Sequence, residues 1–334
     1  MKSRTTILFI LFTAAVAVLF AADIAVGSVS IPIRDVWAAL TGGECDPTTA
    51  RIIRDIRLMK AVVALVAGAA LAVSGLQMQT LFRNPLAGPY VLGVSSGASL
   101  GVALFILGAP MLGLTGHAWL SSLGVAGAAW IGAAATLALV AAISTRIKDI
   151  MVILILGMMI SSGVSAIVQI LQYLSAEEAL KSFVVWTMGS LGDVTATQLA
   201  LLLPAVAAGA ALGVAAIKSL NMLLLGENYA RSMGLDLHRS RSIILLSTTL
   251  LAGTVTAFCG PIGFIGLAMP HVARVIFRNA DHRTLMPAAA LTGAASLLLC
   301  DMVAKLLALP VNSITALLGI PVVVWVVVRN RNIV

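Results

Sequence analysis

One short pattern in the sequence is typical of a covalent catalyst. The run GVSSG at residues 93–97 matches G-x-S-x-G, in which the central serine, here Ser95, attacks a carbonyl carbon. That motif needs a strand that turns sharply into a helix, and its serine needs a base such as His271 within reach. Here the motif opens an apolar run, and no strand pattern precedes it. The hydrolase hypothesis therefore depends on a strand that the sequence does not predict.

The sequence also lacks the usual motifs for binding metals and nucleotides. The cysteines and histidines form no H-E-x-x-H motif and no metal-type spacing; they are Cys45, Cys259, Cys300, His117, His238, His271 and His282. No G-x-x-x-x-G-K-[ST] phosphate loop occurs. We expect no metal and no cofactor in this chain. If ATP drives its function, a separate chain binds the ATP.

The composition indicates a membrane protein. Of the 334 residues, 60% are hydrophobic and 10% are charged, and the mean hydropathy is +1.07; a soluble domain carries roughly 25% charged residues. Apolar runs long enough to cross a bilayer recur along the whole chain. We predict an all-α polytopic fold that forms a single transmembrane domain over residues 1–334. Its ten spans lie near 7–26, 61–82, 91–112, 119–143, 150–174, 197–217, 243–259, 265–277, 285–307 and 312–328.

The first span has two interpretations. Its basic start and apolar run also occur in signal peptides, which are removed from the mature protein. The many spans that follow favour an uncleaved first helix.

Basic residues gather on alternate connections between the spans. If both termini are cytoplasmic, the inside segments hold 14 Lys and Arg against 4 Asp and Glu, and the other segments hold 7 against 9. An excess of Lys and Arg marks the cytoplasmic side of a membrane protein. The net charge of +8 is therefore a topology signal, and we expect contact with membrane lipid and none with nucleic acid.

The predicted spans contain few charges. Asp301 and Lys305 lie near an outer helix end, where we expect them to reach water. A proton- or ion-coupled carrier is an alternative function, and it would need an acidic side chain inside the membrane. The sequence shows no ladder of buried acids and histidines.

A set of small residues recurs at an offset of 185 residues. Ala67, Gly68, Gly75 and Pro85 are repeated as Ala252, Gly253, Gly260 and Pro270. In the charge-derived topology the two copies cross the membrane in opposite directions. This echo predicts an inverted repeat, which is common in transporters.

A stretch of prolines and glycines ends one span and starts the next. Pro85 and Pro89 cannot continue a helix, so the backbone groups that they free must face protein or a water-filled cavity. Gly93, Gly97 and Gly101 then recur at every fourth residue, which lets membrane helices approach closely. We predict an inner turn that leads into a tightly packed helix.

The longest inside segment, residues 218–241, is amphipathic. Gly226 and Gly234 separate two predicted short helices with leucines and methionine on one side. The residues alone leave two hypotheses open. The segment lies on anionic lipid, or it docks a cytoplasmic partner.

Four sequence blocks together resemble one family: the FecCD-type permeases of bacterial binding-protein-dependent ABC importers for iron complexes and cobalamin. The blocks are IRLMKAVVALVAGAALAVSGLQMQTLFRNPLAGPYVLGVSSGASLG, LNMLLLGENYARSMGL, GPIGFIGLAMPHVARVIFRNADHRTLMP and DMVAKLLALPVNSITALLGIPVVVWVVVR. The resemblance covers most of the chain, about 50–330. It implies a type II importer architecture with two permease subunits, two ATPase subunits that bind ATP-Mg, and a periplasmic or lipid-anchored substrate-binding protein.

The resemblance also implies roles for single residues. It places Gly226, Glu227, Ala230, Arg231 and Gly234 in the cytoplasmic loop that couples to the ATPase. It implies that Arg57, Lys60 and Lys305 dock the binding protein. Met59 and Lys60 depart from the family's RLPR pattern, and lysine cannot form the bidentate contacts of arginine. Gly88 stands where the family usually has Asp.

The pathway is also placed by the resemblance. An inner gate is expected near Lys148, Asp149 and Ile150. The polar side of the pathway is expected in the fifth span, at Ser161, Ser162, Ser165 and Gln169. A face that carries serines also suits hydrogen bonds between helices, so both interpretations stay open.

The resemblance thus implies a non-catalytic permease subunit in the bacterial inner membrane with both termini in the cytoplasm. We predict a ferric siderophore as its cargo, with haem and cobalamin as alternatives. We expect a homodimer, because one chain carries a complete set of the family's motifs.

Overall fold

The computed structural model describes residues 2–27, 29–91, 93–108, 122–144, 147 and 150–329, and these residues form helices and connections without a β-strand. The elements are α1 (Lys2–Ala25), α2 (Ile33–Thr41), α3 (Pro47–Arg51), η1 (Ile52–Leu58), α4 (Met59–Leu81), α5 (Val94–Ala103), η2 (Leu104–Gly108), α7 (Ser122–Ser144), α8 (Ile150–Leu174), α9 (Glu177–Thr187), α10 (Ala196–Ala215), α11 (Ile217–Leu223), α12 (Glu227–Ser232), α13 (Leu237–Thr248), η3 (Thr249–Gly253), α14 (Thr254–Cys259), α15 (Ile265–Phe277), α16 (His282–Leu307) and α17 (Val311–Arg329). The three η segments are π-helical turns.

Where the structure describes them, the ten predicted spans are confirmed as helices. Within the described ranges, six helices are long and apolar enough to cross a membrane, and four shorter apolar helices lie at 94–108, 124–140, 265–277 and 311–326. Each predicted span falls on one of these ten segments. The sequence did not predict the short helices α2, α3 and α9, which lie outside the apolar runs.

Short side chains determine where several helices begin. The carboxylate of Asp236 accepts a hydrogen bond from the backbone N–H of Arg239 at 3.0 Å, and it caps α13. Asp281 caps α16 in the same way through Arg283 N–H at 2.9 Å. Such caps satisfy N–H groups that have no partner within the helix. They start both helices at a hydrophilic loop.

The helices divide into two compact units. Unit 1 comprises residues 1–73, 190–203 and 263–334, and unit 2 comprises residues 74–189 and 204–262. The division falls within α4 and within α10.

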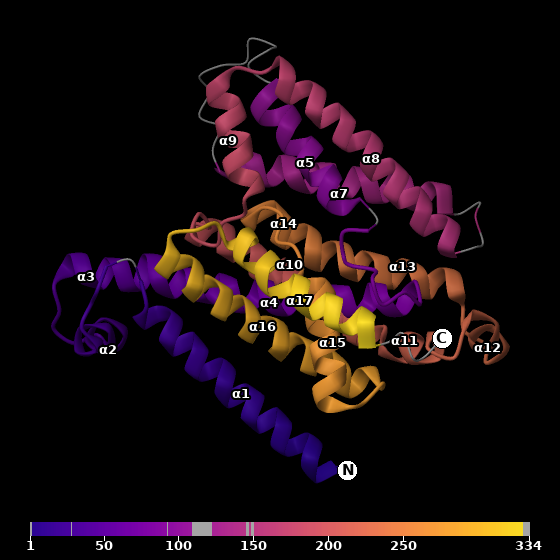
Figure 1. Ribbon diagram of the computed structural model, residues 1–334, viewed down its shortest axis with the longest axis horizontal. Coiled ribbons are helices and arrows are strands. Elements are labelled where there is room, and N and C mark those ends of the chain that lie inside the picture. Colours follow the sequence, from indigo (N-terminus) through magenta and orange to yellow (C-terminus); the bar gives the residue numbers. More distant parts are fainter. Residues whose placement is uncertain are drawn as a thin grey trace. The chain divides into compact units, whose positions relative to one another are not determined.

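In unit 1, α1 and α16 lie side by side and run in the same direction (Figure 1). The Phe9 ring lies 4.9 Å from the ring of Phe277 near one end of this pair, and Asp23 contacts Lys305 near the other end. The first part of α4 packs directly on α16, since a Cβ atom added at Gly68 or Gly293 would collide with the carbonyl of the other residue. This close backbone contact explains why both positions are glycine.

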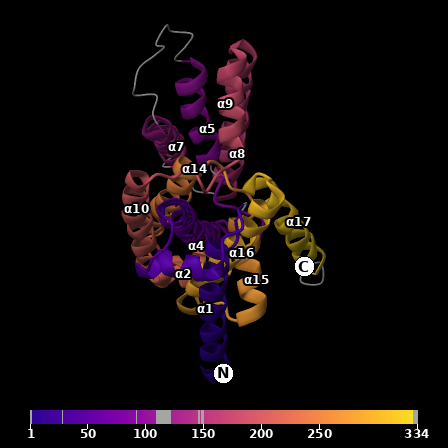
Figure 2. The same cartoon turned by 90° about the vertical axis from the view of Figure 1, so that its left-hand side faces the viewer.

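In unit 2, α5 lies against α7, α8 and α9 (Figure 2). Gly97 and Gly101 face α7, where an added Cβ atom would collide with the carbonyls of Gly132 and Ala128 respectively. Gly93 has a different role. It precedes α5 with φ +80°, a backbone conformation that favours glycine. The glycine series thus supplies one backbone turn and one close helix contact.

The echoed small residues occupy different local structures. Gly75 lies inside α4, whereas Gly260 follows the end of α14 with φ +72°. Pro85 lies in the turn after α4, whereas Pro270 lies inside α15. The echo therefore gives no support to an inverted repeat, which stays a prediction.

Candidate functional site

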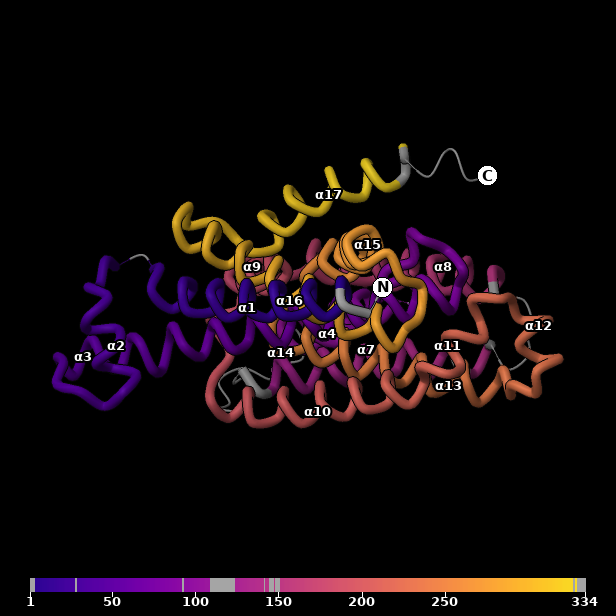
Figure 3. The backbone as a smooth tube through the Cα atoms, turned by 90° about the horizontal axis from the view of Figure 1, so that it is seen from below, coloured from indigo at the N-terminus to yellow at the C-terminus, as the bar shows by residue number. Residues whose placement is uncertain are grey.

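The predicted coupling loop forms two short helices at one end of unit 2. Figure 3 shows α12 where α11 and α13 meet, and α13 begins at Leu237, inside the predicted range 218–241. Gly226 and Gly234 have φ values of +104° and +82°, which favour glycine. Gly226 lies between α11 and α12, and Gly234 follows α12. The predicted pair of short helices is therefore confirmed as α11 and α12.

The five residues expected to couple to an ATPase have different surroundings. Ala230 is fully buried, and Glu227 accepts a hydrogen bond from Arg241, whose Nη2 atom lies 2.6 Å from its Oε1 atom. This ion pair fastens α12 to α13. Arg231 and Gly234 are exposed, whereas Gly226 is buried. Three of the five residues therefore hold the shape of the loop, and two lie on its surface.

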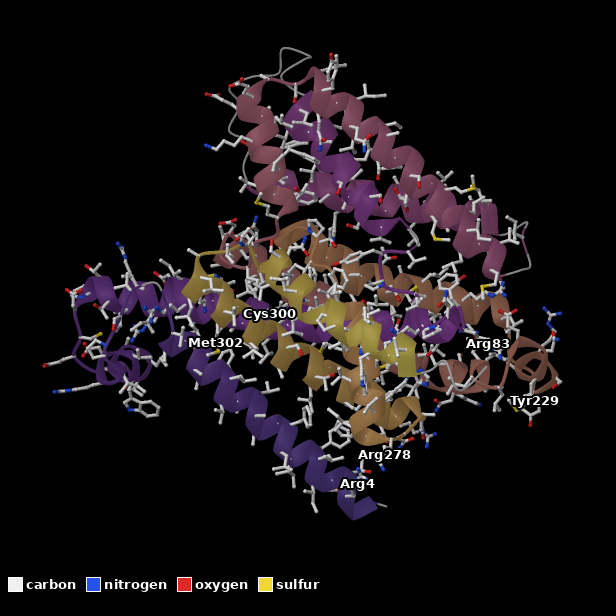
Figure 4. All side chains as sticks on the ribbon, viewed as in Figure 1. Arg4, Arg83, Tyr229, Arg278, Cys300 and Met302 are labelled. Atoms are coloured by element: carbon white, nitrogen blue, oxygen red, sulfur yellow. The ribbon has the colours of Figure 1, made fainter. Side chains whose placement is uncertain are left out.

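The sequence reasoning missed three exposed apolar side chains here. Leu225, Tyr229 and Met233 are 61%, 54% and 43% exposed. Tyr229 lies on α12, and Leu225 and Met233 lie just before and just after it. Together with Arg231 they form what we call the coupling surface. Figure 4 shows Tyr229 at the same end of unit 2 as Arg83.

A second site is a polar cleft of about 270 Å³ in unit 2, between α5, α8 and α9. Five hydroxyl groups and two carboxamides line it, together with two apolar side chains. The lining residues are Ser95, Ser96, Ser99, Ser165, Val168, Gln169, Gln172, Phe183 and Thr187. We call this site the polar cleft. It includes Ser165 and Gln169, two of the four residues predicted for the pathway.

The other two predicted pathway serines have partners on their own helix. Ser161 Oγ donates to the carbonyl of Gly157 at 2.8 Å, and Ser162 Oγ donates to that of Met158 at 3.0 Å. Such bonds satisfy a hydroxyl group within a membrane helix. Ser161 also lies against Gly93, where an added Cβ atom would be 2.9 Å from its Oγ atom. The polar face of α8 thus includes back-bonded serines and, further along, the cleft residues.

The predicted gate lies mostly outside the described residues. Lys148 and Asp149 are not among them, and Ile150 is described only as the first residue of α8.

The G-x-S-x-G hypothesis lacks its structural context. Ser95 lies in the first turn of α5, and the described part of the chain contains no strand that could lead into this helix. The site therefore does not have the geometry of a nucleophile elbow.

A third site is a cluster of four charges in unit 1. Asp301 on α16 contacts Lys60 at 3.0 Å through Oδ1 and Lys305 at 2.8 Å through Oδ2. Lys305 also contacts Asp23 of α1 at 2.8 Å. We call these four residues the charge cluster. Both acids are fully buried, so the expectation that Asp301 reaches water was wrong. The predicted helix end at residue 307 agrees with α16, so the error lies in the packing, which encloses Asp301 between Lys60 and Lys305. Sequence reasoning also overlooked Asp23.

Arg57 is also held inside unit 1. Its side chain is 4% exposed, and its guanidinium donates to the carbonyls of Ile24, Ala25 and Val29. Ile24 and Ala25 end α1, where helix carbonyls lack partners within the helix, and Val29 lies in the segment that follows. Arg57 therefore caps α1.

These contacts bear on the expectation about docking. Arg57, Lys60 and Lys305 were expected to offer cations to an outer partner, but each is engaged within unit 1. A docking role would require these contacts to open, and it stays a prediction. Apart from the Asp301–Lys305 pair, which is four residues apart, the sequence could not reveal these contacts, because the partners are distant along the chain.

Comparison with known proteins identifies the family. The sequence profile of the FecCD transport family matches residues 14–329. The hemin transport system permease protein HmuU of Yersinia pestis is 37% identical over 91% of this chain and 90% of that protein. The vitamin B12 import system permease protein BtuC of Shigella boydii serotype 18 is 35% identical over 88% and 89% of the two chains. The molybdate import system permease protein MolB of Haemophilus influenzae is 34% identical over 88% and 86%.

The fold agrees with the sequence comparison. A solved structure described as an inward-facing conformation of a metal-chelate type ABC transporter superposes with a TM-score of 0.84 at 31% identity. The match covers 97% of this chain and 99% of that one. The chain thus has the type II permease fold and is a non-catalytic permease subunit of an ABC importer. It belongs to the FecCD transport family.

Proposed function

We propose that this chain carries an iron complex across the bacterial inner membrane, with a ferric siderophore as the cargo. The observation that carries the import function is similarity over about nine tenths of its length to permeases named for hemin and vitamin B12 import. The choice of a ferric siderophore rests on the resemblance of the four sequence blocks to iron-complex permeases. Haem and cobalamin are the alternative cargoes. The assembly contains two copies of this chain, two ATPase subunits that bind ATP-Mg, and a periplasmic or lipid-anchored binding protein.

Both termini lie in the cytoplasm in this proposal. The distribution of Lys and Arg along the sequence supports this orientation. Figure 4 shows Arg4 and Arg278 at the same end of unit 1, whereas the charge cluster lies near the C-terminal ends of α1 and α16. Parallel α1 and α16 therefore begin inside and end outside.

The coupling surface is the contact with the ATPase. Glu227 and Ala230 hold α12 in place, while Leu225, Tyr229 and Met233 offer apolar side chains outside the apolar spans. Aromatic and Met side chains beside an arginine are typical of a protein interface. Closure of the ATPase pair then moves α12 and, through the ion pair with Arg241, α13.

The polar cleft forms part of the pathway. A membrane helix that carries hydroxyls and carboxamides must face protein or a water-filled space. Ser165 and Gln169 supply such groups from α8, and α5 supplies the serines on the opposite wall. Lys148, Asp149 and Ile150 remain the proposed inner gate.

The experiment is purification of the tagged chain with its ATPase from native membranes, followed by ATP-driven uptake in proteoliposomes. Tyr229→Arg and Met233→Arg should abolish co-purification of the ATPase. Asn228→Ala, an exposed position on α12 outside the coupling surface, should not. A chain that is stable and transports cargo without any ATPase would overturn the proposal.

A further inference from the structure

The polar cleft points to a class of cargo. We infer that it receives the periphery of a metal chelate whose outer groups are neutral hydrogen-bond donors and acceptors, such as amides. This inference rests on the proposed import function. It adds a preference against chelates and oxyanions that present negative charge.

The lining of the polar cleft is neutral. All nine residues that the structure places around the cleft are uncharged. Serine and threonine hydroxyls both donate and accept, and the glutamine amides offer two donors and two acceptors. This mixed set fits amide groups on a ligand, which also donate and accept. A carboxylate or an oxyanion accepts only, and cations would bind it better.

Two of these groups are available to a ligand. The hydroxyls of Ser161 and Ser162 on α8 donate hydrogen bonds to backbone carbonyls one helical turn earlier. The Thr187 hydroxyl likewise donates to the carbonyl of Val184 at 2.7 Å. The structure assigns no such intrahelical bond to Ser165 among its described contacts, and the Gln169 side chain is exposed. These two groups can therefore bind a passing ligand.

The volume of the polar cleft limits what it can hold. The cleft of about 270 Å³ is at the small end of ligand pockets, which hold roughly 300–1,000 Å³. A whole chelate does not fit, but one arm of its periphery does. The buried side chains of Phe183 and Val168 form the apolar part of the lining, against the carbon skeleton of that arm. A second copy of the chain in the assembly would offer the same neutral groups to another arm.

The neutral lining makes it costly to move a charged group from water into the cleft. A charged group that leaves water for such a site loses hydration, and no opposite charge replaces it. A neutral amide exchanges water for hydroxyl and amide partners at little net cost. Tight binding is not required for transport, so modest neutral contacts suit a cargo that must also leave.

The test is uptake by the complete transporter, reconstituted with its ATPase and binding protein, of four probes. Ferrichrome and cyanocobalamin present neutral peptide or carboxamide groups, whereas haemin and molybdate are anionic. We expect wild-type uptake of a neutral probe and little uptake of either anion. Gln169→Glu should lower that uptake by about tenfold or more, because it places an unmatched charge in the cleft. Gln169→Met, of similar length and neutral, should lower it less.

Two measurements separate the outcomes. The melting temperature of Gln169→Glu in detergent should equal that of wild type, because the side chain is exposed, and this equality shows that the variant folds. Ser182→Glu is the matched control, because Ser182 on α9 is exposed, back-bonded to Glu178 and outside the cleft. Preferred uptake of haemin or molybdate, or wild-type uptake of the neutral probe by Gln169→Glu, would overturn the inference and leave the importer function standing. No ATP-driven uptake of any probe by wild type would instead remove both proposals.

Discussion

The Nζ atom of Lys305 lies 2.8 Å from Oδ1 of Asp23, and this ion pair joins α16 to α1. The lysine side chain is 8% exposed, and the acid is completely buried. The contact connects residues that are 282 positions apart in the sequence. Asp301 and Lys60 complete the charge cluster, so two acids are matched by two lysines. The first helix is therefore fastened to the rest of unit 1 by charge as well as by apolar packing.

We predict that Asp23→Asn destabilises the protein strongly. The substitution keeps the size of the side chain but leaves the buried positive charges without one of their partners. Breaking a buried ion pair on one side costs roughly 3–5 kcal/mol. The measurement is thermal unfolding in detergent, followed by a dye that reacts with buried cysteines such as Cys259 and Cys300 as they become exposed.

The control for this prediction is the double variant Asp23→Asn/Lys305→Met. Because both charges of the pair are then absent, the double variant should be less destabilised than the sum of its two single variants. Additive losses would mean that Lys305 and Asp23 do not interact energetically.

A second prediction concerns the contact of α5 with α7. Gly97→Val should separate these helices, because even a Cβ atom at residue 97 would collide with Thr136 and with the carbonyl of Gly132. Overpacking of this kind costs about 1–3 kcal/mol or more. Gly127→Ala on α7 is the matched control, since nothing lies within 4 Å of its added Cβ atom. We expect that control to be neutral or stabilising by up to about 1 kcal/mol. Equal melting temperatures for the two variants would contradict the packing.

The spans could be predicted because a bilayer imposes one requirement on every crossing segment, a long apolar run. The short helix α15 followed from the same pattern, and its bounds agree with the prediction. Helices α2 and α9 could not be predicted in this way. They are amphipathic and lie outside the apolar runs, so no hydropathy threshold marks them.

The candidate sites were predicted less completely. The glycines around α12 were visible because positive φ angles favour glycine. The charge cluster was missed, because Asp23 and Lys305 meet only through the packing of α1 on α16. Their partnership depends on tertiary structure, which a single sequence does not reveal. The same reason explains why Arg57 was expected to face outward.

A third prediction tests the ion pair that holds α12. Glu227→Arg should loosen the coupling loop and reduce cargo-dependent ATP hydrolysis, because it places like charge beside Arg241. The reversed pair, Glu227→Arg/Arg241→Glu, should recover much of this activity because it restores an ion pair. Recovery would show that Glu227 acts by positioning α12. Without recovery, Glu227 itself would have to contact the ATPase.

The last prediction concerns Gln77, a fully buried residue of α4 in unit 2. Its Nε2 atom donates to Ser247 Oγ at 3.0 Å, and its Oε1 atom accepts from Thr248 Oγ1 at 3.1 Å. The hydroxyl proton of Ser247 is already directed to the carbonyl of Gly209 at 2.7 Å. Ser247 can therefore only accept from residue 77.

Gln77→Glu should consequently destabilise the protein more than Gln77→Met does. A carboxylate at residue 77 would place an acceptor against the lone pair of Ser247. Methionine would only remove the hydrogen bonds to the hydroxyls of Ser247 and Thr248, which lowers the free energy of unfolding by about 1–3 kcal/mol. The melting temperature of Gln77→Glu should rise as the pH falls, because the protonated acid regains a donor. That rise, measured against the Gln77→Met variant between pH 8 and pH 5, must exceed any change in wild type. If Gln77→Glu melts like wild type at both pH values, the donor and acceptor arrangement around Gln77 is not the one described.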